Sequence, residues 1–365
     1  MPKRSALLVA NSVYQLLTAV HLKQSFLTDC ETELVLTDNL PGGEVYAPRL
    51  MQTGLFRRVL LAATKEMNRK YAIGRDEEIA EGFAHIPSLF RWTLSDELTA
   101  YDQIYFSNFD IFARMLACVY DERPCEFICY EDGFSSYVID YLRIDRAAVN
   151  RCPAGRKIHD KVSAVLLYEP RLAMRGDDLP NRPLPKIRRD DAPLRKLLNF
   201  IFDYKPPREQ PEFLFLEQSF RAEGIKSNDL VLMQACLQVV GAGRFAVKPH
   251  PRNPEYVPYR MGLTRKYDVD VPWELFLLNE DVSDQTIITV CSNAALTGRL
   301  VFGLDINTVM LYPLFQGKVL WKEDAVLKRY LRKFRDEFAG SRYYVPQTLY
   351  ELRHILEYLG GSHER

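Results

Sequence analysis

The sequence lacks any apolar stretch long enough to cross a bilayer, and it carries no net charge. Its 48 Lys and Arg residues balance 48 Asp and Glu residues, so a global attraction to nucleic acid is not expected. Lys3 and Arg4 precede a short apolar run, as in a signal peptide, but polar residues interrupt that run from Asn11 onward. These features indicate a cytoplasmic protein.

The sequence also lacks the phosphate-binding motifs GxGxxG and GxxxxGK[ST], internal repeats and low-complexity tracts. Of its seven cysteines, Cys125 and Cys129 lie four positions apart, but no second Cys or His pair follows at zinc-site spacing. The odd number favours buried free thiols in a reducing compartment. No metal site is therefore predicted.

What the sequence does contain is a regular alternation of apolar strands and helical segments. Its 365 residues exceed what one hydrophobic core usually serves, which predicts two domains. The alternation indicates mostly parallel sheets with helices on both faces. Strands are predicted at residues 6–10, 33–37, 58–62, 102–106 and 126–130, and in a second series at 212–217, 244–248, 286–290 and 307–311.

A proline-rich stretch between residues 176 and 211 separates the two series. We therefore predict an N-terminal domain over 1–185, a linker over 186–210 with a short helix near 194–202, and a C-terminal domain over 211–365. The last helix is a candidate to pack back on the N-terminal domain. In such domains ligands bind beyond the carboxyl ends of the strands.

The first polar cluster is Glu131-Asp132-Gly133, which follows the predicted strand at 126–130. A carboxylate held at the end of a buried strand can act as a general base, and apolar surroundings raise its pKa toward neutrality. An Asp-Gly pair is also common in solvated turns for backbone reasons alone. The residues themselves leave both interpretations open.

The second cluster runs from Lys248 to Arg252 and holds His250 between Pro249 and Pro251. A histidine between two prolines has a restricted backbone and cannot lie inside a regular helix. Three nitrogen-bearing side chains within five residues suit a phosphate, and a histidine can protonate a phosphate as it leaves. The alternative is an exposed basic turn.

The third cluster is Cys291-Ser292-Asn293, between a predicted strand and an alanine-rich helix. Ser292 or Asn293 suits the N-cap, and N–H groups and hydroxyls at a helix N-terminus also bind phosphate. The two roles are compatible. Each cluster is a weak signal alone, but all three follow predicted strands, which makes the set more specific.

In this order the clusters resemble the acidic, His-Pro and Ser/Thr-rich motifs of bacterial sialyltransferases. The resemblance is to the lipooligosaccharide sialyltransferase group (glycosyltransferase family 52) and its polysialyltransferase relatives. Residues 8–17 resemble the N-terminal strand, loop and helix of that group, and residues 213–218 and 271–274 resemble its later landmarks. The resemblance covers about residues 5 to 300.

The resemblance implies a GT-B fold, in which two Rossmann-like domains face each other across a cleft. It implies an inverting glycosyltransferase that transfers sialic acid from CMP-Neu5Ac to a hydroxyl of a glycan acceptor of the lipooligosaccharide or capsule type. The N-terminal domain is then expected to bind the acceptor and the C-terminal domain the CMP-sugar. Such enzymes need no metal or other cofactor, and no nucleic-acid partner is expected.

The resemblance also implies a role for each matching residue. Glu131 matches the general base that deprotonates the acceptor hydroxyl, and His250 matches the histidine that contacts the CMP phosphate and assists its departure. Glu274 matches an acidic residue that binds the ribose hydroxyls. The remaining matches are expected near the donor (Lys248, Pro251, Ser292, Asn293) and on the acceptor side or in structural positions (Asp132, Gly133, Asn11, Gln15).

The chain departs from the group's pattern at two places. The third motif is usually richer in hydroxyls, so phosphate contacts here rest on Ser292 and backbone N–H groups, and the base is Glu where many members carry Asp. Two alternatives stay open: a CMP-Kdo-dependent transferase, and a non-catalytic CMP-sugar-binding protein of the same fold. The sequence does not indicate the acceptor, the linkage or the oligomeric state.

Residues 327–338 combine apolar residues at helical spacing with five interspersed Lys and Arg residues. A basic amphipathic helix can lie on an anionic membrane surface, which suggests peripheral contact at the inner face of the membrane. The commoner alternative is a surface helix that packs on its own domain.

Overall fold

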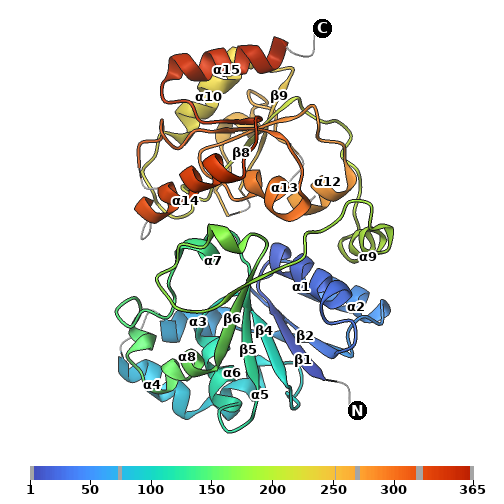
Figure 1. Ribbon diagram of the computed structural model, residues 1–365, viewed down its shortest axis with the longest axis vertical. Coiled ribbons are helices and arrows are strands. Elements are labelled where there is room, and N and C mark those ends of the chain that lie inside the picture. Colours follow the sequence, from blue (N-terminus) through green and yellow to red (C-terminus); the bar gives the residue numbers. More distant parts are fainter. Residues whose placement is uncertain (1–3, 73–75, 251, 268–271, 318–323, 362–365) are drawn as a thin grey trace. The chain divides into compact units, whose positions relative to one another are not determined.

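The computed structural model describes residues 4–72, 76–250, 252–267, 272–317 and 324–361 (Figure 1). The chain divides into two compact units. The first comprises Met1–Ile187 with Asp191–Asp203, and the second comprises Arg188–Asp190 with Tyr204–Arg365. Each unit is a parallel sheet with helices on both faces, which confirms the predicted α/β class.

The sheet of the first unit has the strand order β3-β2-β1-β4-β5-β6-β7, and its described strand pairs are all parallel. The order reverses at β1, as in doubly wound nucleotide-binding folds. Central strands are apolar on both faces because helices cover both sides, and Ala6, Leu7 and Leu8 are fully buried. The strands are β1 (Ser5–Ala10), β2 (Glu31–Thr37), β3 (Arg58–Ala62), β4 (Gln103–Phe106), β5 (Glu126–Tyr130), β6 (Val162–Leu167) and β7 (Asn181–Pro183).

Two groups of helices cover the two faces of this sheet (Figure 1). The first group comprises α1 (Val13–Ser25), α2 (Gly43–Gln52) and α9 (Ala192–Phe202). Because α9 contacts both α1 and α2, it is part of the first unit. The other helices of this unit are α3 (Lys65–Ala72), α4 (Asp76–Ala84), α5 (Ile86–Thr93), α6 (Ile111–Val119), α7 (Ser135–Val138) and α8 (Lys157–Lys161).

The sheet of the second unit has the order β12-β11-β10-β8-β9, again with parallel described pairs. Its strands are β8 (Phe213–Leu216), β9 (Phe245–Lys248), β10 (Thr286–Thr289), β11 (Asn307–Met310) and β12 (Tyr343–Tyr344). Its helices are α10 (Asp229–Val240), α11 (Val257–Arg260), α12 (Trp273–Asn279), α13 (Ala294–Phe302), α14 (Asp324–Glu337) and α15 (Leu349–Gly361). Within this unit α15 packs against α10, and α12 packs against α13.

Every strand predicted from the sequence is present, with ends that differ by one or two residues. Three strands were not predicted: β6, β7 and β12. β6 is an apolar run that resembles the other buried strands, whereas β7 lies in the proline-rich stretch and ends at Pro183. A proline lacks the N–H that a central strand needs, and β7 tolerates one because it forms the edge of its sheet.

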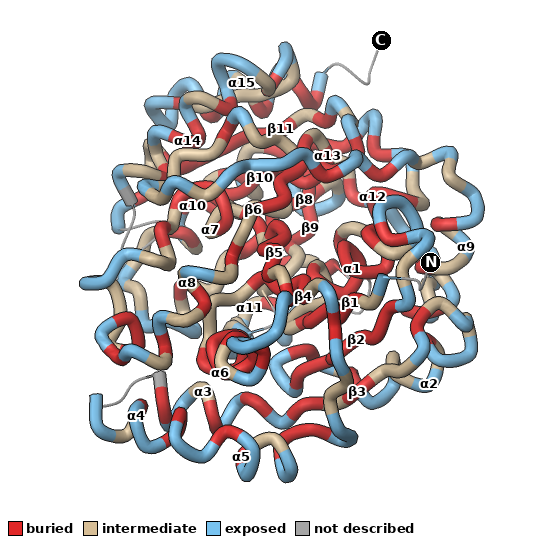
Figure 2. Tube along the Cα trace, turned by 60° about the horizontal axis from the view of Figure 1, so that its bottom comes forward, coloured by how far each residue is buried: buried red, intermediate tan, exposed pale blue. Residues whose placement is uncertain are grey.

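The basic helix predicted at 327–338 corresponds to α14. Its apolar residues Leu327, Tyr330, Leu331 and Phe334 are at most 1% exposed, so this side of the helix is packed inside the second unit. Insertion of that side into a membrane is therefore contradicted, and the packed surface helix is confirmed. Figure 2 shows the same pattern across the chain, with buried strands and exposed outer helix faces. No described helix combines the length and apolarity needed to span a membrane.

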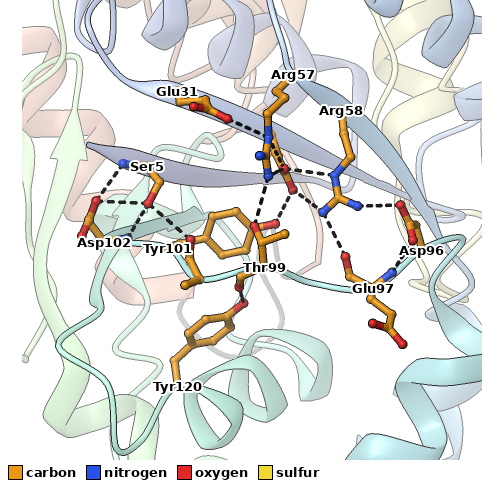
Figure 3. Close-up of polar contacts among 12 residues, drawn as sticks. Ser5, Glu31, Arg57, Arg58, Asp96, Glu97, Thr99, Tyr101, Asp102 and Tyr120 are labelled. Atoms are coloured by element: carbon orange, nitrogen blue, oxygen red, sulfur yellow. Dashed lines mark hydrogen bonds and ion pairs between the residues drawn. The ribbon is translucent and has the colours of Figure 1, made fainter. Parts of the chain in front are cut away.

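A buried ion-pair network lies near the amino ends of the first sheet's strands (Figure 3). The Glu33 carboxylate is 1% exposed and accepts hydrogen bonds from Arg57, Arg58 and the Tyr101 hydroxyl. Burial raises the pKa of Glu33, but these three donors outweigh burial and hold the pKa below its usual value. This network ties β2 and β3 together at the end opposite the candidate site.

Candidate active site

The carboxyl edge of the first sheet gathers the polar residues predicted on the acceptor side. Glu131 directly follows β5, and Asn11 directly follows β1. Asn108 lies two residues after β4, which runs between those two strands. Because parallel strands end at one edge of a sheet, these side chains come from different parts of the chain into one cluster.

Glu131 is a fully buried carboxyl held by three donors. Its Oε1 accepts from the Tyr14 hydroxyl at 3.0 Å, and its Oε2 accepts from the Tyr137 hydroxyl at 2.5 Å and the Tyr168 backbone N–H at 2.8 Å. Burial raises the pKa of Glu131 to about 7, even though these hydrogen bonds oppose the shift. A carboxyl with a pKa near neutrality is suited to exchange a proton with a substrate.

Asp132 and Gly133 complete the acidic motif. Burial also raises the pKa of Asp132, against a hydrogen bond from the Gln15 side chain. The Asp132 backbone N–H donates to the Ser136 hydroxyl at 2.7 Å, which fixes the turn into α7. Gly133 has φ +68°, a left-handed conformation that glycine adopts without strain, so the turn depends on it.

Asn11 and Gln15 join the strand ends to one another. The Asn11 and Gln15 side-chain amides both donate to the side-chain oxygen Oδ1 of Asn108, at 2.9 and 2.6 Å. The Thr37 hydroxyl donates to the side-chain oxygen Oδ1 of Asn11 at 2.6 Å. Asn11 and Gln15 were predicted from the sequence, whereas Asn108, Tyr14 and Tyr137 were not. Polar residues directly after an apolar strand were an available signal for Asn108.

In the second unit His250 lies just beyond β9. Its Nδ1 accepts from the Arg252 backbone N–H at 3.3 Å, which assigns the ring proton of the neutral form to Nε2. Burial lowers the pKa of His250, and the charge of Arg252 adds to that effect. The imidazole is therefore neutral at pH 7 and presents an N–H donor.

Glu217 fastens the His250 loop to the end of β8. Its carboxylate is 4% exposed and accepts from the His250 backbone N–H at 3.2 Å and the Asn253 side chain at 3.0 Å. It also pairs with Arg221 and accepts from the Tyr259 hydroxyl. Glu217 lies in the segment 213–218 that resembles a family landmark, but no role was predicted for it from the sequence. Its signal was the same as that of Glu131, an acidic residue directly after a buried strand.

Ser292 and Asn293 lie between β10 and α13. The Ser292 hydroxyl accepts from the Ala294 backbone N–H at 3.3 Å. Asn293 occupies the N-cap position of α13 without a side-chain cap bond, and its side-chain oxygen is buried without a partner among the described residues. The Cys291 backbone N–H donates to the Gln218 side chain at 2.7 Å, which ties this loop to β8.

Glu274 lies in the first turn of α12. Burial raises the pKa of Glu274, while the positive charge of Lys248 opposes the shift. The Trp273 indole N–H donates to the Ala294 carbonyl at 2.7 Å and so fixes α12 against the start of α13. Pro251 lies outside the described residues.

The structure thus forms two clusters, each within one unit. The acidic cluster of the first unit contains Glu131, Asp132, Asn11 and Gln15. In the second unit, β9 and β10 flank β8, so the His250 and Ser292 loops lie about 10 Å apart along one carboxyl edge. No cluster of His, Cys, Asp or Glu suited to a metal ion occurs among the described residues. The absence of a metal or cofactor requirement stays a prediction.

All seven cysteines are free thiols, as predicted. Five are buried, whereas Cys30 and Cys118 are partly exposed. Burial raises the pKa of Cys125 to about 11 and that of Cys129 to about 12, which keeps both protonated and poorly reactive.

Comparison with known proteins shows similarity of fold without similarity of sequence. No protein-family model matches the chain, and no curated protein sequence matches it significantly. Among solved structures, Arabidopsis thaliana UGT89C1 complexed with UDP-L-rhamnose is similar at 10% identity and a TM-score of 0.52, over 98% of this chain and 90% of that chain.

Two further structures give the same result. The α/β-galactoside α-2,3-sialyltransferase of Photobacterium phosphoreum is similar at 7% identity and a TM-score of 0.51, over 94% of this chain and 99% of that chain. LpCGTa in complex with UDP is similar at 11% identity and a TM-score of 0.51, over 98% and 91%. With the two parallel-sheet units, these similarities confirm the GT-B fold.

Proposed function

We propose that the protein is an inverting, metal-independent glycosyltransferase that transfers sialic acid from CMP-Neu5Ac to a glycan hydroxyl. The observation that carries the proposal is Glu131, a buried carboxyl with a pKa of about 7 at the carboxyl edge of one Rossmann-like unit. The GT-B fold and its similarity to a sialyltransferase structure support a glycosyl transfer reaction. The three motifs support the CMP-sugar donor.

On the acceptor side, Glu131 is the proposed general base. The acceptor hydroxyl replaces the Tyr14 hydroxyl on Oε1, because Glu131 is otherwise fully buried and its Oε2 is occupied by two donors. As the acceptor oxygen forms its bond to the anomeric carbon, its proton passes to Glu131. Attack on the face opposite CMP inverts the anomeric centre.

On the donor side, the bond between the anomeric carbon and the phosphate oxygen breaks, and its electron pair leaves with CMP. The Nε2–H of His250, the Lys248 ammonium and the N–H groups at the start of α13 are the proposed stabilisers of that charge. Ser292 adds a hydroxyl at the same helix start. Glu274 is the proposed contact to the ribose hydroxyls, because it matches the ribose-binding acidic residue of the group that the motifs resemble.

The test is CMP release from CMP-Neu5Ac with a galactose-terminated acceptor. We expect acceptor-dependent release by the wild type and a loss of at least about 100-fold in kcat for Glu131→Gln and His250→Ala. Glu77→Gln and His354→Ala, on exposed parts of α4 and α15, are matched controls that retain activity. Turnover of CMP-Kdo alone would change the donor, and CMP binding without turnover of either sugar would overturn the proposal.

A further inference from the structure

A second site lies along the carboxyl edge that carries Glu131. A cavity of about 490 Å³ opens at the ends of β2 and β3, a volume typical of small-molecule sites. Leu36, Leu61 and Leu94 give it apolar walls. Trp92 also lines it and has 55% of its surface exposed, although a large aromatic side chain is normally covered.

Two charged side chains that line this cavity have no partner among the residues that the structure describes. The Glu44 carboxylate and the Lys65 ammonium form no hydrogen bond or ion pair with any residue that the structure describes. The Thr93 hydroxyl is buried without a partner in the described part of the chain, and Thr93 is only 3% exposed. Glu44 and Lys65 are therefore available to form hydrogen bonds with a ligand in the cavity.

The wall that carries Trp92 is held rigidly. Ala63 donates to the Thr93 carbonyl at 2.8 Å, and Ser95 donates to the Leu61 carbonyl at 2.9 Å, so the segment 93–95 runs antiparallel along β3. Beyond it Arg58 binds the Asp96 carboxylate at 2.5 Å (Figure 3). The cavity is therefore preformed, which lowers the ordering cost of binding.

The combination fits a pyranose ring. A sugar has an apolar C–H face that can stack on an indole, and its rim of hydroxyls both donates and accepts hydrogen bonds. The Glu44 carboxylate accepts hydrogen bonds, and the Lys65 ammonium donates them.

The cavity is connected to Glu131 by a row of strand ends. Thr37 lines the cavity and donates to Asn11, Asn11 donates to Asn108, and Tyr14 donates to Glu131. Two strands, β1 and β4, separate β2 from β5, which places their ends about 14 Å apart. One sugar ring cannot span that separation, whereas an oligosaccharide of several units can.

We propose that this cavity is a distal acceptor subsite, which binds a pyranose unit of an oligosaccharide whose terminal hydroxyl reaches Glu131. The acceptor is then an oligosaccharide of several units and not a mono- or disaccharide. This inference rests on the proposed function, because the role of Glu131 defines the reacting end of the acceptor.

The experiment compares a galactose-terminated disaccharide with a tetrasaccharide that carries the same terminal disaccharide, at saturating CMP-Neu5Ac. The wild type should have a KM for the tetrasaccharide about tenfold below that for the disaccharide. Trp92→Ala should bring this ratio close to one, by raising the KM for the tetrasaccharide. Phe26→Ala, which removes another exposed aromatic side chain of the first unit, should leave the ratio unaltered.

A direct binding measurement separates this inference from the proposed function. Titration calorimetry with the tetrasaccharide should give binding that Trp92→Ala weakens about tenfold. Such binding without transfer would support the subsite and overturn the proposed function. If the two acceptors had equal KM values and Trp92→Ala changed neither, the subsite would be overturned while the proposed function stands. Tetrasaccharide binding that Trp92→Ala does not weaken would also overturn the subsite.

Discussion

Removal of the Tyr14 hydroxyl should change the pKa of Glu131. Tyr14 is one of three donors to this carboxylate, and all three lower a pKa that burial raises to about 7. Tyr14→Phe removes one donor and nothing else from the ring. A hydrogen bond to a charged group contributes about 1.5 kcal/mol, which corresponds to about one pKa unit. The pKa of Glu131 in the variant should therefore lie near 8.

The assay is the pH dependence of kcat/KM for the acceptor, which reports the free enzyme. A base must be deprotonated to act, so kcat/KM should fall about tenfold per pH unit below the pKa and reach a plateau above it. The acid limb should move upward by about one unit in Tyr14→Phe. At pH 7 the variant should be about fivefold slower than the wild type, and above pH 9 the two should agree.

The control is Tyr350→Phe, which removes the hydroxyl of an exposed tyrosine on α15 and should leave the profile unchanged. The reasoning would be refuted by a wild-type profile that bends near the ordinary glutamate pKa. An unshifted acid limb in Tyr14→Phe would refute it too, because the hydrogen bond would then not control the ionisation of the reacting carboxyl.

Three other outcomes follow from the same structure. Burial raises the pKa of Glu131 to about 7, so the contribution of Glu131 to stability falls as pH rises from about 4.5 to 7. Glu131→Gln should therefore be inactive yet about 2 kcal/mol more stable than the wild type at pH 8, seen as a higher Tm, and a lower Tm would contradict this. The ion pairs of Glu33 lower its pKa, so Glu33 stabilises the fold above about pH 4.5, and this contribution is lost at lower pH. Glu33→Gln should lower the free energy of unfolding in urea by about 2–3 kcal/mol at pH 7 and by much less near pH 3. An equal loss at both pH values would rule out the ion pairs. CMP should raise the lowered pKa of His250 by at least about one unit in an NMR titration. A pKa of His250 that does not change with CMP would remove this residue from the phosphate site.

The sequence was sufficient for the fold because its signals there were local. The strands around β1 and β5 are short apolar runs closed by polar residues, and helical segments separate them, which dictates parallel sheets. The strand β7 was missed because prolines argue against a strand unless its place at a sheet edge is known. That place depends on the pairing of β7 with β6, which the local pattern of residues 181–183 does not reveal.

The candidate site was predictable only where its residues adjoin a strand. Glu131 and His250 follow apolar runs, so their positions stand out. The partners of Glu131 could not be recognised in the same way. Nothing in the sequence near Tyr137 and Tyr168 indicates a site, and only the fold brings these two residues to the carboxylate. The cavity at Trp92 could not be predicted from the sequence, because its walls come from three separate segments of the chain.

The segment 93–95 has a second consequence besides shaping a cavity wall. A seven-stranded open sheet ends in two rows of unpaired backbone groups, and such rows recruit strands from other molecules. On the β3 side the segment 93–95 occupies that row, and on the β7 side the edge strand is three residues long and ends in Pro183. Both borders of this sheet are thereby protected in part from edge-to-edge pairing, and at β3 the protecting segment is the one that directly follows Trp92.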